Sequence, residues 1–184
     1  MSRDMWMKIF ISCLCMITFN QVGTTQDRPS GPATPEARAA DVASVDAIVA
    51  AVYDVISGPA GQKRDWDRMR SLFVPGARLI PVSQVAEVKA ARILSVEDYI
   101  ARSSATLEKG GFFEREIARL TEKFGHIAHL FSTYESRRKA EDPVPFNRGI
   151  NSFQLMNDGK RWWIVTIFWE AEGPDSPIPP EFLK

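Results

Sequence analysis

The chain has 184 residues, of which 45% are hydrophobic and 25% charged, and this composition is typical of one globular domain rather than a disordered chain. Basic and acidic residues both number 23, so the formal net charge is zero and the basic excess of a nucleic-acid-binding protein is missing. Because Cys13 and Cys15 are the only cysteines and the chain has 2 histidines, we expect no disulfide framework, no metal site and no cofactor.

The first forty residues have the pattern of a signal sequence and a linker. Arg3 and Lys8 precede an apolar run over residues 9–19, which is too short to span a bilayer but suits the core of a signal peptide. We expect a signal peptide over 1–23, removed on export to the periplasm or outside the cell, and no integral membrane span in the mature form. The alternatives are a misassigned start codon or an uncleaved hydrophobic tail. Residues 24–40, rich in Pro, Ser, Thr and Gly, predict a flexible linker.

Three helices are predicted next. Apolar residues recur at three- and four-residue spacing over 42–56, which indicates a first helix that ends before Gly58-Pro59. Asp65 can cap a short second helix that ends at Pro75-Gly76. The segment Ser95-Val96-Glu97-Asp98 resembles a capping box, and it opens a third helix that runs to about Lys109.

Strands dominate the rest of the chain. Short strands are predicted at 78–82 and 91–94, and Pro81 would confine the first to an edge or a bulge. Four longer strands form two hairpins, 112–123 with 126–139 and 148–156 with 161–170. Helices followed by antiparallel strands predict an α+β domain over 41–172, in which three N-terminal helices pack on one face of the sheet. The Pro-rich tail, 173–184, is predicted to be extended over the surface.

Two-residue turns at Asp158-Gly159 and Phe124-Gly125 would decide which side chains share a face. In the second hairpin, one predicted face holds Gly149, Asn151, Phe153 and Leu155 with Trp162, Ile164, Thr166 and Phe168. The opposite face holds Arg148, Ile150, Ser152 and Gln154 with Trp163, Val165, Ile167 and Trp169. In the first hairpin, one face would hold Glu116, Ala118 and Leu120 with His129, Phe131 and Thr133; the other, Arg115, Ile117, Arg119 and Thr121 with Ala128, Leu130, Ser132 and Tyr134.

The order helix, helix, strand pair, helix, four-stranded meander resembles the nuclear-transport-factor-2-like superfamily, which includes steroid Δ-isomerases, scytalone dehydratase and SnoaL-like polyketide cyclases. The likeness covers about residues 41–172. It is carried by the segments Leu72-Phe73-Val74-Pro75-Gly76-Ala77, Gly125-His126-Ile127-Ala128, Ser132-Thr133-Tyr134-Glu135 and, above all, residues 148–155 followed by Asn157-Asp158-Gly159 and Arg161-Trp162-Trp163-Ile164-Val165. The resemblance implies a curved antiparallel sheet that forms a cone-shaped α+β barrel around a pocket, and it leaves the activity open.

The resemblance also implies positions for a site. Tyr53 matches the tyrosine of the steroid-isomerase oxyanion hole and Asn151 matches its acid, while Pro81 stands at the position of the base. Because Pro81 cannot accept a proton, steroid-isomerase chemistry is not expected. The same mapping places His129, Phe131 and Thr133 on the pocket side.

We therefore take His129, Asn151 and Tyr53 as candidate catalytic residues, with Glu116 or Glu135 able to orient the histidine. The candidate ligand-pocket residues are Trp66, Phe131, Thr133, Phe153, Trp162, Thr166 and Phe168. For each residue the alternative is a structural role: a hydrogen-bonded wall residue, a core tyrosine, or an aromatic core.

Two functions follow from these residues. The first is an exported small-molecule-binding pocket protein that acts by acid–base chemistry on an apolar, oxygenated ligand. The second is a non-enzymatic domain for self-association or partner binding, and whether the protein is an enzyme stays open.

A homodimer is expected through the sheet face away from the helices. The hairpin pairing puts Trp163, Val165, Ile167, Trp169 and Ile150 on that face, and the family mapping adds Leu130 and Tyr134. A contiguous apolar patch of this size usually marks a contact surface. The alternative is that the tail from Gly173 folds back and covers this face.

Overall fold

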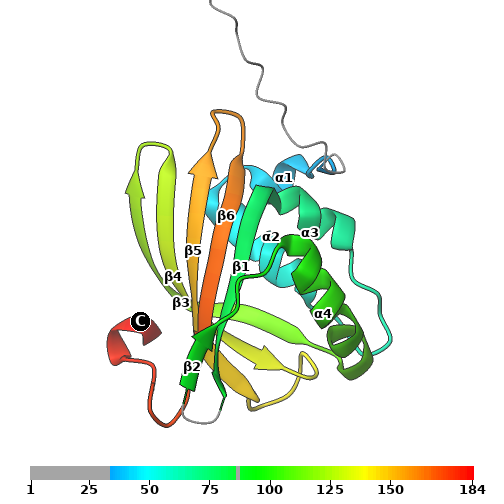
Figure 1. Ribbon diagram of the computed structural model, residues 1–184, viewed down its shortest axis with the longest axis vertical. Helices are drawn as coiled ribbons and strands as arrows, with labels where there is room; N and C mark the ends of the chain where they lie inside the picture. Colours follow the sequence, from blue (N-terminus) through cyan, green and yellow to red (C-terminus); the bar gives the residue numbers. More distant parts are fainter. Residues whose placement is uncertain (1–33, 86–87) are drawn as a thin grey trace, which may run out of the picture. The chain divides into compact units, whose positions relative to one another are not determined.

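A six-stranded sheet with helices on one side organises the molecule, and the computed structural model describes residues 34–85 and 88–184 (Figure 1). The predicted signal peptide and most of the predicted linker lie outside the described residues. The strand order is β2-β1-β6-β5-β4-β3, and the sheet is curved and unclosed. The elements in chain order are α1 (Ala39–Val42), α2 (Val45–Ile56), α3 (Trp66–Leu72), β1 (Phe73–Val85), β2 (Val88–Ala91), α4 (Val96–Gly110), β3 (Phe113–Phe124), β4 (Ile127–Arg137), β5 (Asn147–Asn157), β6 (Trp162–Ala171) and the 3-10 helix η1 (Pro180–Leu183).

The helices confirm the predicted α+β class with one change. The first predicted helix is two, because Ser44 is extended and accepts a hydrogen bond from the Ala47 amide at 3.0 Å, which caps α2 and separates it from α1. The predicted caps of α3 and α4 are present: Asp65 accepts from the Arg68 amide, and Ser95 and Asp98 form a capping box. No helix among the described residues is long and apolar enough to cross a membrane.

The sheet is mixed, so the expectation of a purely antiparallel sheet is wrong at one place. β1 pairs in parallel with β6 and antiparallel with β2, whereas β3 to β6 form the predicted antiparallel meander. β1 is also longer than predicted and is an inner strand, so Pro81 does not confine it to an edge.

Both long hairpins have a register different from the prediction. The β3–β4 turn is Gly125-His126, with Phe124 opposite Ile127 and a positive φ at Gly125. In the β5–β6 hairpin, Asn157 lies opposite Trp162, because Asp158 accepts hydrogen bonds from the amides that follow it and so builds a longer loop. A shift of two residues leaves the faces unchanged near the turns.

A bulge in each hairpin then changes the faces farther from the turn. Val165 is an extra residue in β6, between Ile164 opposite Leu155 and Thr166 opposite Gln154. Beyond it, Ile167 is buried and Trp169 packs against the core, whereas Phe168 is 43% exposed on the face away from the helices, the outer face. The predicted inward orientation of Thr166 and Phe168 is therefore wrong.

The second bulge lies in β3, where Ile117 is the extra residue between Glu116, opposite Tyr134, and Ala118, opposite Thr133. On β4 the buried Ala128, Leu130, Ser132 and Tyr134 form the inner face, toward the helices. His129, Phe131 and Thr133 therefore lie on the outer face, and their predicted pocket-side placement is wrong. Burying Leu130 and Tyr134 is more favourable than burying the polar ring of His129.

The C-terminal tail returns to the outer face of β3 and β4, on the side of the sheet opposite the helices (Figure 1). The rings of Phe131 and Phe182 lie 5.4 Å apart, and the Thr133 hydroxyl donates to the Phe182 carbonyl at 2.5 Å. Ile178 is also buried. The tail therefore covers part of the outer face, as the alternative expected, but at Phe131 and Thr133, which were not among the residues predicted for a dimer surface.

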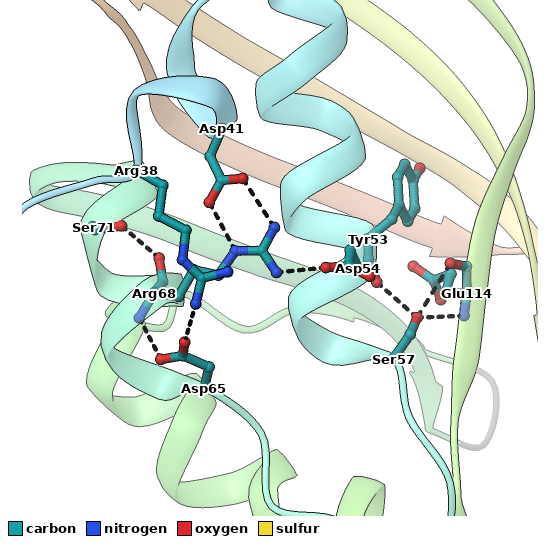
Figure 2. Close-up of polar contacts among 9 residues, drawn as sticks. All are labelled: Arg38, Asp41, Tyr53, Asp54, Ser57, Asp65, Arg68, Ser71 and Glu114. Carbon is teal, nitrogen blue, oxygen red and sulfur yellow. Dashed lines mark hydrogen bonds and ion pairs between the residues drawn. The ribbon is translucent and has the colours of Figure 1, made fainter.

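Arg68 ties three helices together (Figure 2). From α3, its guanidinium donates to Asp41 of α1 at 2.7 Å and to Asp54 of α2 at 2.5 Å. The side chains of Arg68 and Asp41 are only 14% and 12% exposed. This ion pair is therefore partly buried, where loss of one partner leaves the other charge without compensation.

Replacing Arg68 with methionine should lower the free energy of unfolding by about 2 kcal/mol, because Asp41 loses its partner. The matched control is Arg70→Met on the same helix, whose partners Asp67 and Glu97 are exposed; we expect less than about 1 kcal/mol there. Urea unfolding followed by circular dichroism measures both values. Equal effects of the two substitutions would contradict the role given to Arg68.

Candidate functional site

A cavity of about 240 Å³ lies between the inner sheet face and helices α2 and α4. Its wall combines apolar and aromatic side chains with a few polar groups, as small-molecule sites do. The polar and aromatic residues that matter below are Tyr53, Tyr99, Glu114, Tyr134, Ser136, Asn151 and Trp169.

Ser57, the residue that ends α2, holds Glu114 in place at the start of β3. The Glu114 amide donates to the Ser57 hydroxyl oxygen at 3.0 Å, and the Ser57 hydroxyl donates to the Tyr53 carbonyl at 2.7 Å (Figure 2). The last turn of α2 is thereby joined to the backbone of Glu114. Tyr53 and Glu114 consequently enter the cavity wall from two elements that are fixed to each other.

Glu114 is half-buried, and the burial of its carboxyl group against the cavity wall raises its pKa to about 7. The Ser136 hydroxyl donates to it at 2.8 Å, and the Asn151 amide also bonds to it; both hydrogen bonds favour the charged form, but burial outweighs them. Among the described residues that line the cavity, none is lysine, arginine or histidine. Glu114 therefore has hydrogen-bond partners there but no cation.

Tyr53 sits in a hydrogen-bonded chain below the cavity. Its hydroxyl lies 2.7 Å from the Ser132 hydroxyl and accepts from the Asn151 amide at 3.0 Å. Ser132 donates its proton to Glu116 at 2.6 Å, and Arg119 donates to Glu116. Because the Ser132 proton is used in this way, Tyr53 must be the donor to Ser132.

Three tyrosines surround Glu114, and each keeps its proton. Burial, and then the charge of Glu114, raises the pKa of Tyr53, Tyr99 and Tyr134. Gly149 allows Tyr134 to reach the wall, since a Cβ at Gly149 would lie 2.5 Å from the Tyr134 hydroxyl oxygen. The Tyr99 ring packs edge-to-face against Trp169, with centroids 6.2 Å apart.

The structure brings together Tyr53, Asn151 and Phe153 of the residues predicted from sequence, and all three line the cavity. Trp66 and Trp162 do not line it: the Trp66 indole donates to Glu108, and Trp162 is buried beneath Lys123. Phe131 and Phe168 line a different crevice of about 240 Å³ under the C-terminal tail. Thr133 is buried against that tail, and Thr166 lines neither space.

His129 lies apart from Tyr53 and Asn151, so the three candidate catalytic residues do not form one site. Its Nε2 is 3.0 Å from the Ser152 hydroxyl, and its Nδ1 is 3.7 Å from a carboxylate oxygen of Glu122, all on the outer face. Neither predicted orienting acid serves it, since Glu116 bonds to Arg119 and Glu135 bonds to Arg115 and Arg137.

Glu114 is the residue that sequence reasoning missed. The signal was its position two residues before Glu116, because alternate residues of a strand share a face. Tyr99, Tyr134 and Ser136 were missed as cavity residues because no short-range pattern links α4 and β4 to Glu114. The described residues contain no cluster of three or more His, Cys, Asp or Glu side chains able to hold a metal ion.

A larger open groove of about 670 Å³ between α2 and β3 also borders Tyr53 and Glu114. The arginines that line it are bonded to other carboxylates: Arg115 and Arg137 to Glu135, and Arg119 to Glu116 and Asp46. Glu114 therefore borders two spaces, the cavity and this more polar groove.

Replacing Glu114 with glutamine should stabilise the protein at pH 8 by about 2 to 3 kcal/mol. The pKa of Glu114 is near 4.5 in the unfolded chain and about 7 in the folded protein, so the folded protein binds this proton more tightly. The free energy of unfolding therefore falls as the pH rises from about 4.5 to 7, and this contribution is constant at higher pH. At pH 5 the substitution should have little effect. Urea unfolding at both pH values measures this.

The matched control is Glu122→Gln, the same change at an exposed position of the same strand. It should leave the free energy of unfolding unchanged at both pH 5 and pH 8. A Glu114→Gln protein that is less stable than the wild type at pH 8 would contradict the raised pKa.

The comparisons with known proteins bear on the fold. No family model matches the sequence, and no curated protein matches it. A protein of unknown function with a cystatin-like fold from Nostoc punctiforme PCC 73102 is 14% identical with a TM-score of 0.55, covering 76% of this chain and 96% of that one. Two NTF2-like proteins of unknown function are also similar. The one from Methylobacillus flagellatus KT is 17% identical (TM-score 0.46; 71% of this chain, 95% of that one), and the one from Shewanella baltica OS155 is 15% identical (TM-score 0.43; 71% and 98%).

The assignment of the fold rests on the Nostoc structure and on the topology described above. Helices cover one face of a curved sheet, and the sheet is built from a meander plus a strand pair. The chain has a cystatin-like α+β fold, and the curved sheet covered by helices that the sequence resemblance implied is present, although the sheet does not close into a barrel.

Proposed function

We propose that this protein binds a small, largely apolar molecule in the cone cavity and that Glu114 exchanges a proton with it. The observation that carries the proposal is the half-buried Glu114 on the cavity wall, whose carboxyl group has a pKa of about 7. Such a group is present in both protonation states at neutral pH, as a general acid or base requires.

The neighbouring residues have different roles in this proposal. Asn151 bonds to Glu114 and to Tyr53, so it orients the carboxyl group. Tyr53 donates to Ser132, and it can stabilise an oxyanion only by giving up that bond; it is therefore a positioning residue. The acid–base role first given to His129 passes to Glu114, and apolar residues such as Val52 and Leu79 would contact the apolar part of the ligand.

The test is binding to the purified chain, with a library of small apolar oxygenated and nitrogenous compounds measured by native mass spectrometry. Asn147→Phe, at a half-buried position of the cavity wall, should weaken every specific binder by about tenfold or more because it fills the space. His129→Ala, on the outer face, should leave binding unchanged. Binding that survives Asn147→Phe but is lost in His129→Ala would move the site to the outer face.

As a second candidate we propose self-association through the outer face. Leu120 is 47% exposed, and Phe168, at the crevice beside the tail, is 43% exposed, so apolar side chains of this face stay accessible to a partner. The surface differs from the predicted one, because Ile167, Leu130 and Tyr134 are buried within the chain.

If a homodimer uses this face, Phe168→Glu should convert it to a monomer without unfolding it, because a charge would be buried in the interface. Val144→Glu, at an exposed position of the loop between β4 and β5, is the control that should leave the dimer intact. Light scattering at micromolar concentrations measures the mass. A wild-type protein that is monomeric at every concentration would exclude the homodimer.

We also propose export, which rests on the basic residues and apolar run of the first nineteen positions. N-terminal sequencing of the protein from its host tests it, and an intact Met1 on cytoplasmic protein would exclude cleavage.

A further inference from the structure

We propose that the cone cavity selects a small organic cation, a protonated amine on an aromatic or aliphatic body, whose ammonium group lies between the Glu114 carboxylate and the rings of Tyr99, Tyr134 and Trp169. This inference rests on the proposed function and names the class of ligand for the same site.

The cavity wall carries one acidic group and no basic one among the described residues. The groups that face Glu114 are Tyr53 from α2, Tyr99 from α4, Tyr134 and Ser136 from β4, and Asn147 and Asn151 from β5, and none of these carries a positive charge. The carboxylate is thus a half-buried negative charge that hydrogen bonds compensate only in part. A cationic ligand would supply the missing partner.

The charged groups beside the cavity do not change this balance. On β3, Glu116 is bonded to Arg119, and Arg115 is bonded to Glu135 of β4. Arg137 of β4 also bonds to Glu135, and Asp54 of α2 bonds to Arg68. Arg115 and Arg137 share Glu135, and each arginine named is bonded to a carboxylate other than that of Glu114.

Aromatic rings form a large part of the cavity wall. An ammonium group is attracted to the faces of tyrosine and tryptophan rings, most strongly where water is excluded. Tyr99 and Trp169 meet edge-to-face beside the cavity, and Tyr134 and Phe112 also line it. A wall of rings around one carboxylate favours a cation with an apolar body over other ligands of that size.

The size of the cavity limits the ligand, and the charge of Glu114 disfavours anionic and neutral ligands. A cavity of about 240 Å³ has room for roughly eight waters at about 30 Å³ each, so it suits a ligand of about that many non-hydrogen atoms. A carboxylate ligand would place a second negative charge beside Glu114. A neutral alcohol could donate one hydrogen bond but would leave the charge without compensation, and so it would favour protonated Glu114.

Opposite pH dependences follow for the two ligand types. An amine that stays protonated binds best to the Glu114 carboxylate, so its affinity should rise about tenfold between pH 6 and pH 8, across the pKa near 7. A neutral alcohol should bind equally well or more weakly at pH 8 than at pH 6.

The experiment is isothermal titration of the full chain with three matched probes: 2-phenylethylamine, 2-phenylethanol and 3-phenylpropionate. At pH 8 the amine should bind at least about tenfold more tightly than the alcohol, and the carboxylate should bind most weakly. Glu114→Gln should remove both the preference for the amine and its pH dependence, while Glu122→Gln on the outer face of the same strand should keep both.

Alcohol binding as tight as amine binding at pH 8, an amine affinity unchanged in Glu114→Gln, or no amine binding at all would overturn the assignment of an organic cation. None of these results contradicts the proposal that the cavity binds a small molecule. That proposal is contradicted only if Asn147→Phe weakens the binding of no compound in the library.

Discussion

The position of α2 over the sheet depends on one buried hydroxyl group, that of Tyr53. A buried polar group must have hydrogen-bond partners, and Tyr53 finds them on two different strands, in Ser132 of β4 and Asn151 of β5. These two bonds fix the helix relative to the middle of the sheet. Ser57 fixes its end to β3, so the space between helix and sheet is set by polar contacts as well as by packing.

The same contacts explain how the structure holds a half-buried acid. Glu114 is joined through its backbone to Ser57, and its carboxyl group bonds to Ser136 and Asn151, so the side chain cannot easily turn toward water. Holding a carboxylate in such a place costs stability at neutral pH, since burial disfavours its charged form. Charged groups whose burial lowers stability are found most often at functional sites. For this reason the proposed function assigns the proton exchange to Glu114 and not to Tyr53.

Local patterns predicted the elements well, and the register limited the prediction of the site. Helix caps at Asp65 and Ser95, and the meander of four strands, depend on residues close in sequence. The orientation of Ile167 and Trp169 depends instead on one extra residue, Val165, and an unrecognised bulge reverses every face beyond it. The orientation of β4 could not be decided from alternation alone, because both of its faces hold aromatic and polar residues; contacts with α2, which is distant in sequence, decide it.

The bulge at Ile117 also decides which of two carboxylates on β3 is paired with an arginine. Glu114 and Glu116 are two residues apart and point to the same side, and without the bulge that side would continue with Ala118. With the extra residue it continues with Arg119, whose guanidinium bonds to Glu116. Glu116 is thus paired with a cation and ends the hydrogen-bonded chain that runs from Tyr53 through Ser132. The Glu114 carboxyl group accepts hydrogen bonds only from uncharged side chains. A single bulge therefore leaves one acid of the pair able to respond to the charge of a ligand.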